Sequence, residues 1–220
     1  MNNIEDYASV LSIYKERKQI GLLCELKICK LVSDVNKFSD KERAEIALMG
    51  SHQRHLNIHA RCMARDLAIE KLAKSHLWNN QYSTFEKLYD DVCEVLDGVS
   101  HIRFITKYDV AKRIGIMIKP EVTPFNYVYL HAGALDGAKR LLNKHIDQGQ
   151  IRMDSQVFAK YFGDLSPLFV EDLLCTMKDY FVNGNIVYPQ SDKKSSGCHR
   201  LYCSKELKEK INNELNCISK

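Results

Sequence analysis

The sequence is poor in the residues that make turns, with 10 glycines and 4 prolines among 220 residues. An all-β fold needs many turns, so this shortage argues against a sandwich or a barrel, and it excludes collagen-like and Pro/Gly-rich disordered chains. No run of 18 apolar residues occurs, so no segment is typical of a membrane-spanning helix. The opening MNNIEDYASV lacks the basic start and apolar run of a signal peptide. We therefore expect a cytoplasmic protein that does not contact a membrane.

Cysteine is plentiful, with eight residues, but no two cysteines show the Cys-x-x-Cys spacing of zinc knuckles or redox motifs. Most of them lie within apolar helical patterns, where a free cysteine behaves as a small buried hydrophobe. Without an export signal, this pattern predicts reduced thiols in a reducing compartment.

The net charge of +4 is too small to indicate a nucleic-acid-binding protein by itself, but the charges are unevenly distributed. Residues 84–98 are mostly acidic, and the stretch that follows is mostly basic. The basic residues of that stretch are Arg103, Lys107, Lys112, Arg113 and Lys119. A second basic cluster comprises Lys193, Lys194, Arg200, Lys205, Lys208 and Lys210. Such runs either contact an anionic partner or form ordinary solvated faces.

Apolar periodicity and cap residues predict a mainly α fold, a helical bundle. Helices are predicted over residues 4–18, 20–33, 39–50, 51–78, 83–98, 106–118, 130–144, 155–162 and 166–182, and from residue 204 onward. Capping boxes, in which two side chains satisfy each other's backbone donors, are predicted for Ser39/Glu42, Ser83/Glu86 and Thr106/Asp109. Gly50 predicts a helix end, and Ser166 followed by Pro167 predicts a helix start.

Two further features concern the later part of the chain. NIVYP (185–189) and CHRLYC (198–203), separated by a polar segment, are predicted to form a small C-terminal β-hairpin. We therefore expect a helical domain over residues 1–183, and a hairpin with a final helix packed on it over residues 184–220. Gly133 and Gly137 predict a close approach between two helices, and FNYVYL (125–130) is expected to be extended or irregular.

A stripe of metal-ligating residue types occurs in the predicted helix 51–78. Its members, at spacings of three and four, are His52, His55, His59, Cys62 and Asp66. Histidines at i and i+4 can hold one zinc ion if other elements supply the remaining ligands. The alternative is a row of half-buried imidazoles at the edge of the core.

A second group, Cys198, His199 and Cys203, lacks the second pair of ligands that a tetrahedral zinc site needs. On a strand, Cys198 and Cys203 would also point to opposite faces, because their separation is odd. Neither group is complete, so the sequence predicts no bound metal and no cofactor.

The segment GVSHIRFITKYD, residues 98–109, connects the acidic helix to the basic stretch. A tight connection that runs into a helix presents unpaired backbone N–H groups to an anion. Arg103 and Lys107 flank this connection, and the combination suits a DNA phosphate. The alternative is an ordinary turn between two helices.

The segments HIRFITKYDVAKRIG, VYLHAGALDGAKRLL and LSPLFVEDLLCTMK, within residues 84–180, resemble the helix-hairpin-helix, DNA-glycosylase-like superfamily. In that family a GxGxxT hairpin precedes a helix, and Thr106 matches the threonine. The resemblance implies a helix-hairpin-helix element, DNA binding and a connection to DNA repair. A helix followed by a hairpin and a basic cluster is also similar to the DNA-contacting wing of winged-helix proteins.

This sequence departs from the family at the chemically important positions. His101 and Arg103 stand where the two hairpin glycines belong. Ile105 stands at the lysine nucleophile, and the catalytic aspartate falls near Tyr129. Standard glycosylase chemistry is therefore not expected from this chain.

We predict a DNA-binding protein of helix-hairpin-helix type. The residues expected to contact nucleic acid are Arg103, Thr106, Lys107, Lys193, Lys194 and Arg200. Two alternatives stay open, a divergent base-excision DNA glycosylase and a protein-interaction or regulatory module without a nucleic-acid role. The sequence leaves open whether the protein is an enzyme, whether it prefers DNA or RNA, and its oligomeric state.

Overall fold

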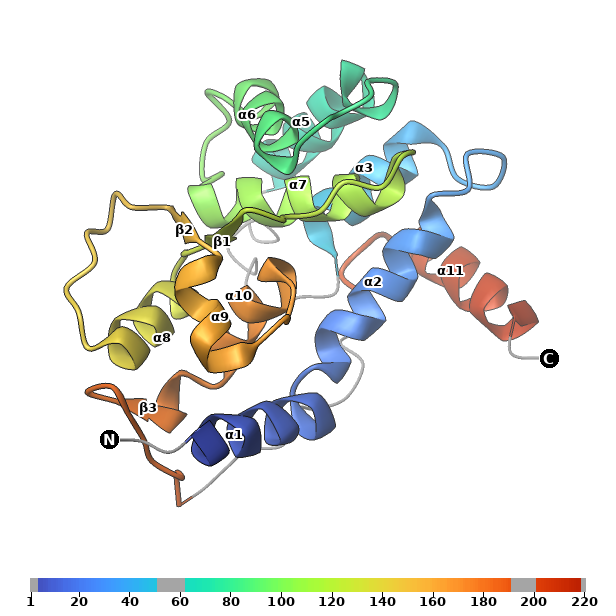
Figure 1. The fold of residues 1–220 in the computed structure, drawn as a ribbon. Coiled ribbons are helices and arrows are strands. Elements are labelled where there is room, and N and C mark those ends of the chain that lie inside the picture. Colours follow the sequence, from blue (N-terminus) through green and yellow to red (C-terminus); the bar gives the residue numbers. More distant parts are fainter. Residues whose placement is uncertain (1–3, 51–61, 191–200, 219–220) are drawn as a thin grey trace. The chain divides into compact units, whose positions relative to one another are not determined.

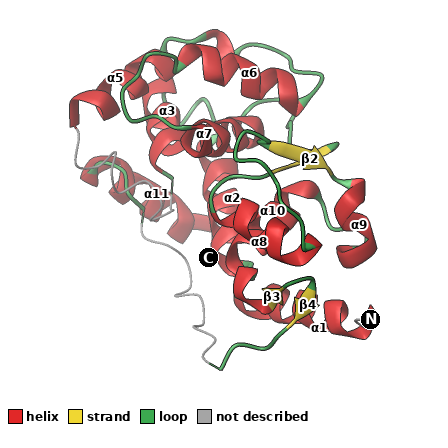
Figure 2. Ribbon diagram, turned by 90° about the vertical axis from the view of Figure 1, so that its left-hand side faces the viewer, coloured by secondary structure: helices red, strands yellow, loops and turns green. Residues whose placement is uncertain are grey.

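A computed structural model describes residues 4–50, 62–190 and 201–218. The described chain is mainly helical and carries two small two-stranded antiparallel sheets, one of them a hairpin, which confirms the predicted fold class (Figures 1 and 2). It divides into two compact units. Unit 1 comprises residues 1–22 and 124–197, and unit 2 comprises residues 23–123 and 198–220. No helix in the described ranges is long and apolar enough to cross a membrane.

Unit 2 is built from helices. They are α2 (Ile20–Val32, its first residues in unit 1), α3 (Asp40–Met49), α5 (Cys62–Ala73), the 3-10 turn η2 (His76–Trp78), α6 (Phe85–Val95), α7 (Phe104–Met117) and α11 (Lys205–Ile218). Helix α3 packs on α5 and α7, and α6 packs on α7. The packing buries Leu48, Leu72, Leu88 and Ile114 completely. Removal of these apolar side chains from water is the main stabilising contribution to the unit.

Unit 1 combines helices with the short strands. Its elements are α1 (Ile4–Arg17), β1 (Tyr127–Tyr129), α8 (Gly133–Leu142), β2 (Arg152–Asp154), α9 (Gln156–Phe162), α10 (Pro167–Thr176), η3 (Lys178–Tyr180), β3 (Phe181–Val182) and β4 (Asn185–Ile186). Helix α10 packs on α8 and on β1, and α1 packs on α9. The Tyr14 hydroxyl of α1 donates a buried hydrogen bond of 2.9 Å to Asp172 Oδ2 of α10. The bond satisfies a carboxylate that is 7% exposed.

The helix ends at Ser39, Gly50 and Ser166 were predicted best. The Ser39–Glu42 capping box is present, with the Ser39 backbone N–H donating to Glu42 Oε2 at 2.8 Å. Helix α3 ends at Gly50, which has a φ of +47° that an L side chain rarely adopts. Helix α10 begins at Ser166 and Pro167 as predicted. These confirmed features all depend on residues within one turn of each other.

Several helix predictions were wrong in their bounds. The start of α6 is one residue later than the predicted Ser83/Glu86 box, because Thr84 is the N-cap and accepts from the Lys87 backbone N–H. The helix predicted to run to residue 78 ends at Ala73 and is followed by the separate turn η2. Its predicted first part, residues 51–61, lies outside the described residues.

The predicted partner strand of the C-terminal hairpin was wrong. Strand β4 pairs with β3, the segment directly before it, and Leu201–Cys203 form no strand. The turn residues Asn183 and Gly184 have φ values of +50° and +76°. An Asn-Gly pair with both φ positive is the favoured two-residue hairpin turn, so this pair reverses the chain. The helix predicted over residues 166–182 accordingly ends at Thr176. A second antiparallel pair joins β1, inside the predicted extended segment, to the unpredicted β2, with α8 between them in the sequence.

The cysteines follow the prediction in part. Four described cysteines, Cys29, Cys93, Cys175 and Cys203, are free thiols. Cys24 is disulfide-bonded, and its partner is none of these four. The prediction of reduced thiols is therefore wrong at Cys24.

Candidate functional site

The predicted basic turn lies between α6 and α7 in unit 2. After α6 ends, two residues of the turn adopt positive φ, Gly98 at +70° and His101 at +67°. Backbone hydrogen bonds from Val99 N to Leu96 O and from Ile102 N to Val99 O, each 3.3 Å, close the connection tightly. Phe85 of α6 and Tyr108 of α7 pack edge to face, with their ring centroids 6.0 Å apart, and so hold the two helices together. The result is a helical hairpin with a short, ordered tip.

Helix α7 begins earlier than predicted. Its N-cap is Arg103, and no side-chain hydrogen bond from the described residues caps it. Thr106 is therefore the third helical residue and not the cap, and its side chain is 4% exposed. Asp109, the expected second member of the box, pairs with Lys112 instead. The hydroxyl of Thr106 is therefore neither a helix cap nor available to a ligand.

Arg103 is the exposed cation of the tip. The described residues provide its guanidinium with no hydrogen-bond or ion-pair partner. The first turn of α7 contains no acidic residue. The first N–H groups of a helix lack intrahelical acceptors and carry the positive end of the helix dipole. The tip therefore combines an exposed guanidinium with uncapped backbone donors, an arrangement that suits an anion.

Lys107 has a different position from the one predicted. It is half-buried, and its Nζ donates to the carbonyl oxygen of Cys93 in α6 at 3.2 Å. This bond ties the first turn of α7 to the end of α6. The other predicted contact residues, Lys193, Lys194 and Arg200, lie outside the described residues.

Lys112 and Arg113, the next two cations of the basic stretch, do not lie on the protein surface. Lys112 is 4% exposed and Arg113 is 0% exposed, and both face the buried carboxylate of Glu25 in α2. Lys112 Nζ and Arg113 Nε each lie 3.1 Å from Glu25 Oε1, and Lys112 Nζ lies 3.1 Å from Asp109 Oδ1. We refer to Glu25, Asp109, Lys112 and Arg113 as the buried ion cluster. Its two positive charges are neutralised inside unit 2, so they are not available to a ligand.

Arg113 also ends helix α3. Its guanidinium donates to the carbonyl oxygens of Ala47 at 2.9 Å and Leu48 at 3.4 Å. A Cβ at Gly50 would overlap this guanidinium, so glycine is needed there for space as well as for its positive φ. Sequence reasoning missed the cluster, although Glu25 within an apolar helical stripe was a signal for it.

Glu25 and Arg113 of this cluster stay ionised at neutral pH. Burial alone would raise the pKa of Glu25, but the charges of Arg113 and Lys112 outweigh burial and hold that pKa well below its ordinary value. For Arg113, burial opposes the charge, but Glu25 and Asp109 raise its pKa. Glu25 and Arg113 are therefore paired charges that hold α2, α3 and α7 together.

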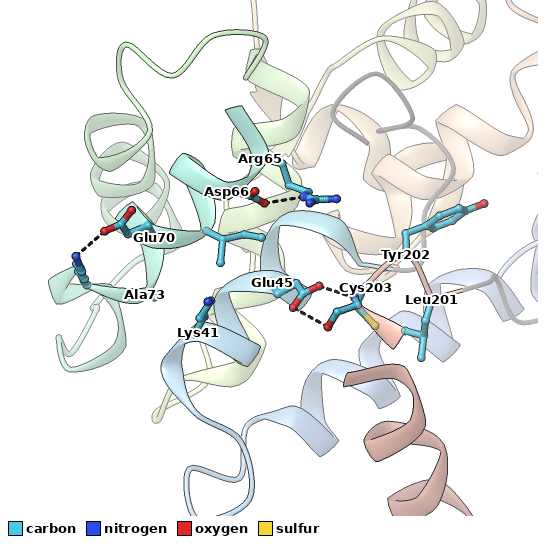
Figure 3. A pocket seen from close by; sticks show the side chains of 12 residues that line it. Lys41, Glu45, Arg65, Asp66, Glu70, Ala73, Leu201, Tyr202 and Cys203 are labelled. Carbon is cyan, nitrogen blue, oxygen red and sulfur yellow. Dashed lines mark hydrogen bonds and ion pairs between the residues drawn. The ribbon is translucent and has the colours of Figure 1, made fainter. Parts of the chain in front are cut away.

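A cavity of about 950 Å³ lies elsewhere in unit 2, between α3, α5 and residues 201–204 (Figure 3). Most of its carboxylates are engaged by neighbouring groups. Glu45 accepts from the Ser204 backbone N–H at 2.6 Å and from its hydroxyl at 3.2 Å. Asp66 pairs with Arg65 at 2.9 Å. Burial raises the pKa of the Cys203 thiol to about 11, so this cysteine is not a thiolate nucleophile at neutral pH.

The described residues contain no group of three or more His, Cys, Asp and Glu side chains placed to hold a metal ion. Of the predicted histidine stripe, His52, His55 and His59 lie outside the described residues. Cys198 and His199 of the second group lie outside them as well. The described members of the two groups offer no metal centre on their own.

The two residues that the sequence resemblance aligns with glycosylase catalytic positions have apolar or buried side chains. Tyr129, near the position of the aspartate in the superfamily, is 0% exposed in β1. Its ring contacts that of His131 at a centroid distance of 6.2 Å. Ile105, at the position of the lysine nucleophile, is half-buried at the start of α7. Neither residue provides a nucleophile or a general base.

Comparison with known proteins adds no relative to this description. No protein-family model matches the chain, and no curated protein or solved structure is similar to it at a significant level.

Proposed function

We propose that the protein binds nucleic acid, DNA in the first instance, through the tip of the α6–α7 hairpin. The observation that carries the proposal is the exposed guanidinium of Arg103, which has no partner among the described residues, at the N-cap of a 14-residue helix. A phosphate at this place accepts hydrogen bonds from the first backbone N–H groups of α7 and an ion pair from Arg103. These contacts carry no base identity, so binding is sequence-independent.

The neighbouring residues support the same assignment in different roles. Lys107 fixes the first turn of α7 against α6 through Cys93 and adds positive charge behind the tip. Lys193, Lys194 and Arg200 lie outside the described residues and stay sequence-based predictions of nucleic-acid contact. The proposal includes no catalytic step, because Ile105 and Tyr129 carry none of the required groups.

Arg103→Ala is expected to weaken DNA binding without unfolding the protein, because the side chain is exposed. For duplex DNA, one lost phosphate contact lowers the magnitude of the slope of log K against log salt by roughly 0.9. Fluorescence anisotropy at several salt concentrations measures this slope. Melting temperature checks that the variant is folded. The single variant tests the phosphate contact alone, whereas a variant that also lacks the Lys107 side chain would lose the hydrogen bond to Cys93 as well.

Lys144→Ala provides the matched control, since it removes one exposed positive charge from unit 1. The control is expected to leave the salt slope unchanged. Absence of binding by the unmodified protein at low salt, or an unchanged slope in folded Arg103→Ala, would contradict the proposal. A protein-interaction or regulatory role would then be the leading hypothesis.

A further inference from the structure

The tip of the hairpin carries an exposed aromatic ring directly after Arg103. Phe104, the first residue of α7, is 60% exposed. In the same hairpin, Phe85 and Tyr108 are 2% and 1% exposed and pack against each other. Phe104 has no ring contact and no cation–π contact within the part of the chain that the structure describes. Its side chain therefore does not belong to the packing that holds α6 to α7.

The surroundings of the ring fit a nucleobase. Arg103 and His101, which lie close to it in the sequence, are both exposed, and the first turn of α7 contains no acidic residue. The connection also carries one exposed carboxylate, that of Asp97, nearer to the end of α6. The guanidinium of Arg103 and the positive end of the α7 dipole favour an anionic partner, and a nucleic acid carries one anionic phosphate for each base. Every nucleobase has an aromatic face, and bases stack on exposed aromatic side chains beside basic groups that hold the backbone.

The strandedness of the partner follows from this arrangement. The bases of an intact duplex are stacked on each other, so a side chain that lies at the phosphate backbone cannot reach their faces. A single strand, by contrast, offers an unstacked base next to each phosphate. We infer that Phe104 stacks on an unpaired base while Arg103 and the α7 N–H groups hold the adjoining phosphate, so that the preferred partner is single-stranded nucleic acid. This inference rests on the proposed function and names its substrate class.

The test compares labelled oligothymidine with a duplex of equal length, by anisotropy. The unmodified protein is expected to bind the single strand more tightly than the duplex. Phe104→Ala is expected to weaken single-strand binding about 5- to 150-fold, which corresponds to the loss of one stacked base. It is expected to leave the salt slope unchanged, because no charge is removed. Phe104→Trp should retain affinity, and the fluorescence of the new tryptophan should be quenched when the oligonucleotide binds.

Phe125→Ala is the matched control, since it removes an 80% exposed phenylalanine from unit 1. It is expected to bind as the unmodified protein does. If Arg103→Ala lowers affinity and slope but Phe104→Ala changes neither, the stacking inference is wrong and the proposed function stands. Equal binding of single strand and duplex, weakened equally by Phe104→Ala, also overturns the inference. If neither oligonucleotide binds at low salt, the proposed function itself fails.

Discussion

Arg113→Ala is expected to destabilise the protein by about 3–5 kcal/mol, the cost of leaving a buried charge without its partner. The substitution leaves the carboxylate of Glu25, which is 2% exposed, without its guanidinium partner. It also removes the donors to the carbonyl oxygens of Ala47 and Leu48 at the end of α3. Urea denaturation followed by far-ultraviolet circular dichroism measures the free energy of unfolding. If the variant proves too unstable to purify, Arg113→Lys gives a smaller loss, because one ammonium cannot reproduce the forked donors of a guanidinium.

Two comparisons separate the loss of the pair from the loss of packing. Arg103→Ala, an exposed arginine on the same helix, is expected to change the unfolding free energy by less than about 0.5 kcal/mol. Glu25→Leu combined with Arg113→Met is expected to be more stable than the sum of the two single effects implies, because neither charge is then left alone. Strict additivity of the single substitutions would show that the two residues do not interact.

The ionisation of Glu25 gives the same cluster a defined pH dependence. Because its pKa is lowered in the folded protein, its contribution to stability is complete above the unfolded pKa of about 4.3 and is lost as the pH falls toward the folded value. The unfolding free energy of the unmodified protein should therefore fall in acid more steeply than that of Glu25→Gln. Parallel curves for the two proteins below pH 4 would contradict this assignment.

Gly137→Ala is expected to cost about 3 kcal/mol, the upper part of the range for overpacked cores. A Cβ at this position would overlap the carbonyl oxygen of Leu174 and lie 2.7 Å from its carbonyl carbon. Both atoms belong to the backbone of α10, which cannot move aside as a side chain does. Helices α8 and α10 must therefore separate, and the melting temperature should fall.

Gly149→Ala is the control for Gly137→Ala, because nothing lies within 4 Å of a Cβ at that position. We expect this change to be neutral or slightly stabilising, since alanine restricts the unfolded chain more than glycine does. An equally small effect at Gly137 would show that α8 and α10 are not in close contact.

The close approach of α8 shows how far the sequence alone could be read. The pair Gly133 and Gly137 predicted a helix contact, and the structure provides it, with a Cβ at Gly133 falling 2.5 Å from Cys175 Sγ. The two glycines predict that another element packs closely against this helix, but they do not identify that element. The caps at Ser39 and Ser166 were predictable for a related reason, because the groups involved are neighbours in the chain.

The failures share the opposite cause. The burial of Lys112 and Arg113 depends on Glu25, far away in the sequence, and no local pattern distinguishes a cation with a buried partner from a solvated one. Thr106 was taken for a cap because its hydroxyl and Asp109 have the right spacing, but Asp109 is held by Lys112. A carboxylate with a stronger partner does not cap a helix. The exposure of Arg103 needs no distant residue and fits the prediction, whereas the accessibility of Thr106 and Lys107 was overestimated.

The order in which the two units appear along the chain has a consequence for synthesis on the ribosome. The polypeptide passes from one unit to the other at residues 22–23, 123–124 and 197–198, so neither unit is continuous. Helix α11, whose Leu207 and Ile211 are almost completely buried, joins unit 2 only after residues 124–197 of unit 1 have emerged. Domains usually fold in turn as they emerge, from the N-terminus onward. Here residues 1–22 must wait for their partners across a hundred intervening residues, and the nascent chain carries two unfinished cores at once during much of its synthesis.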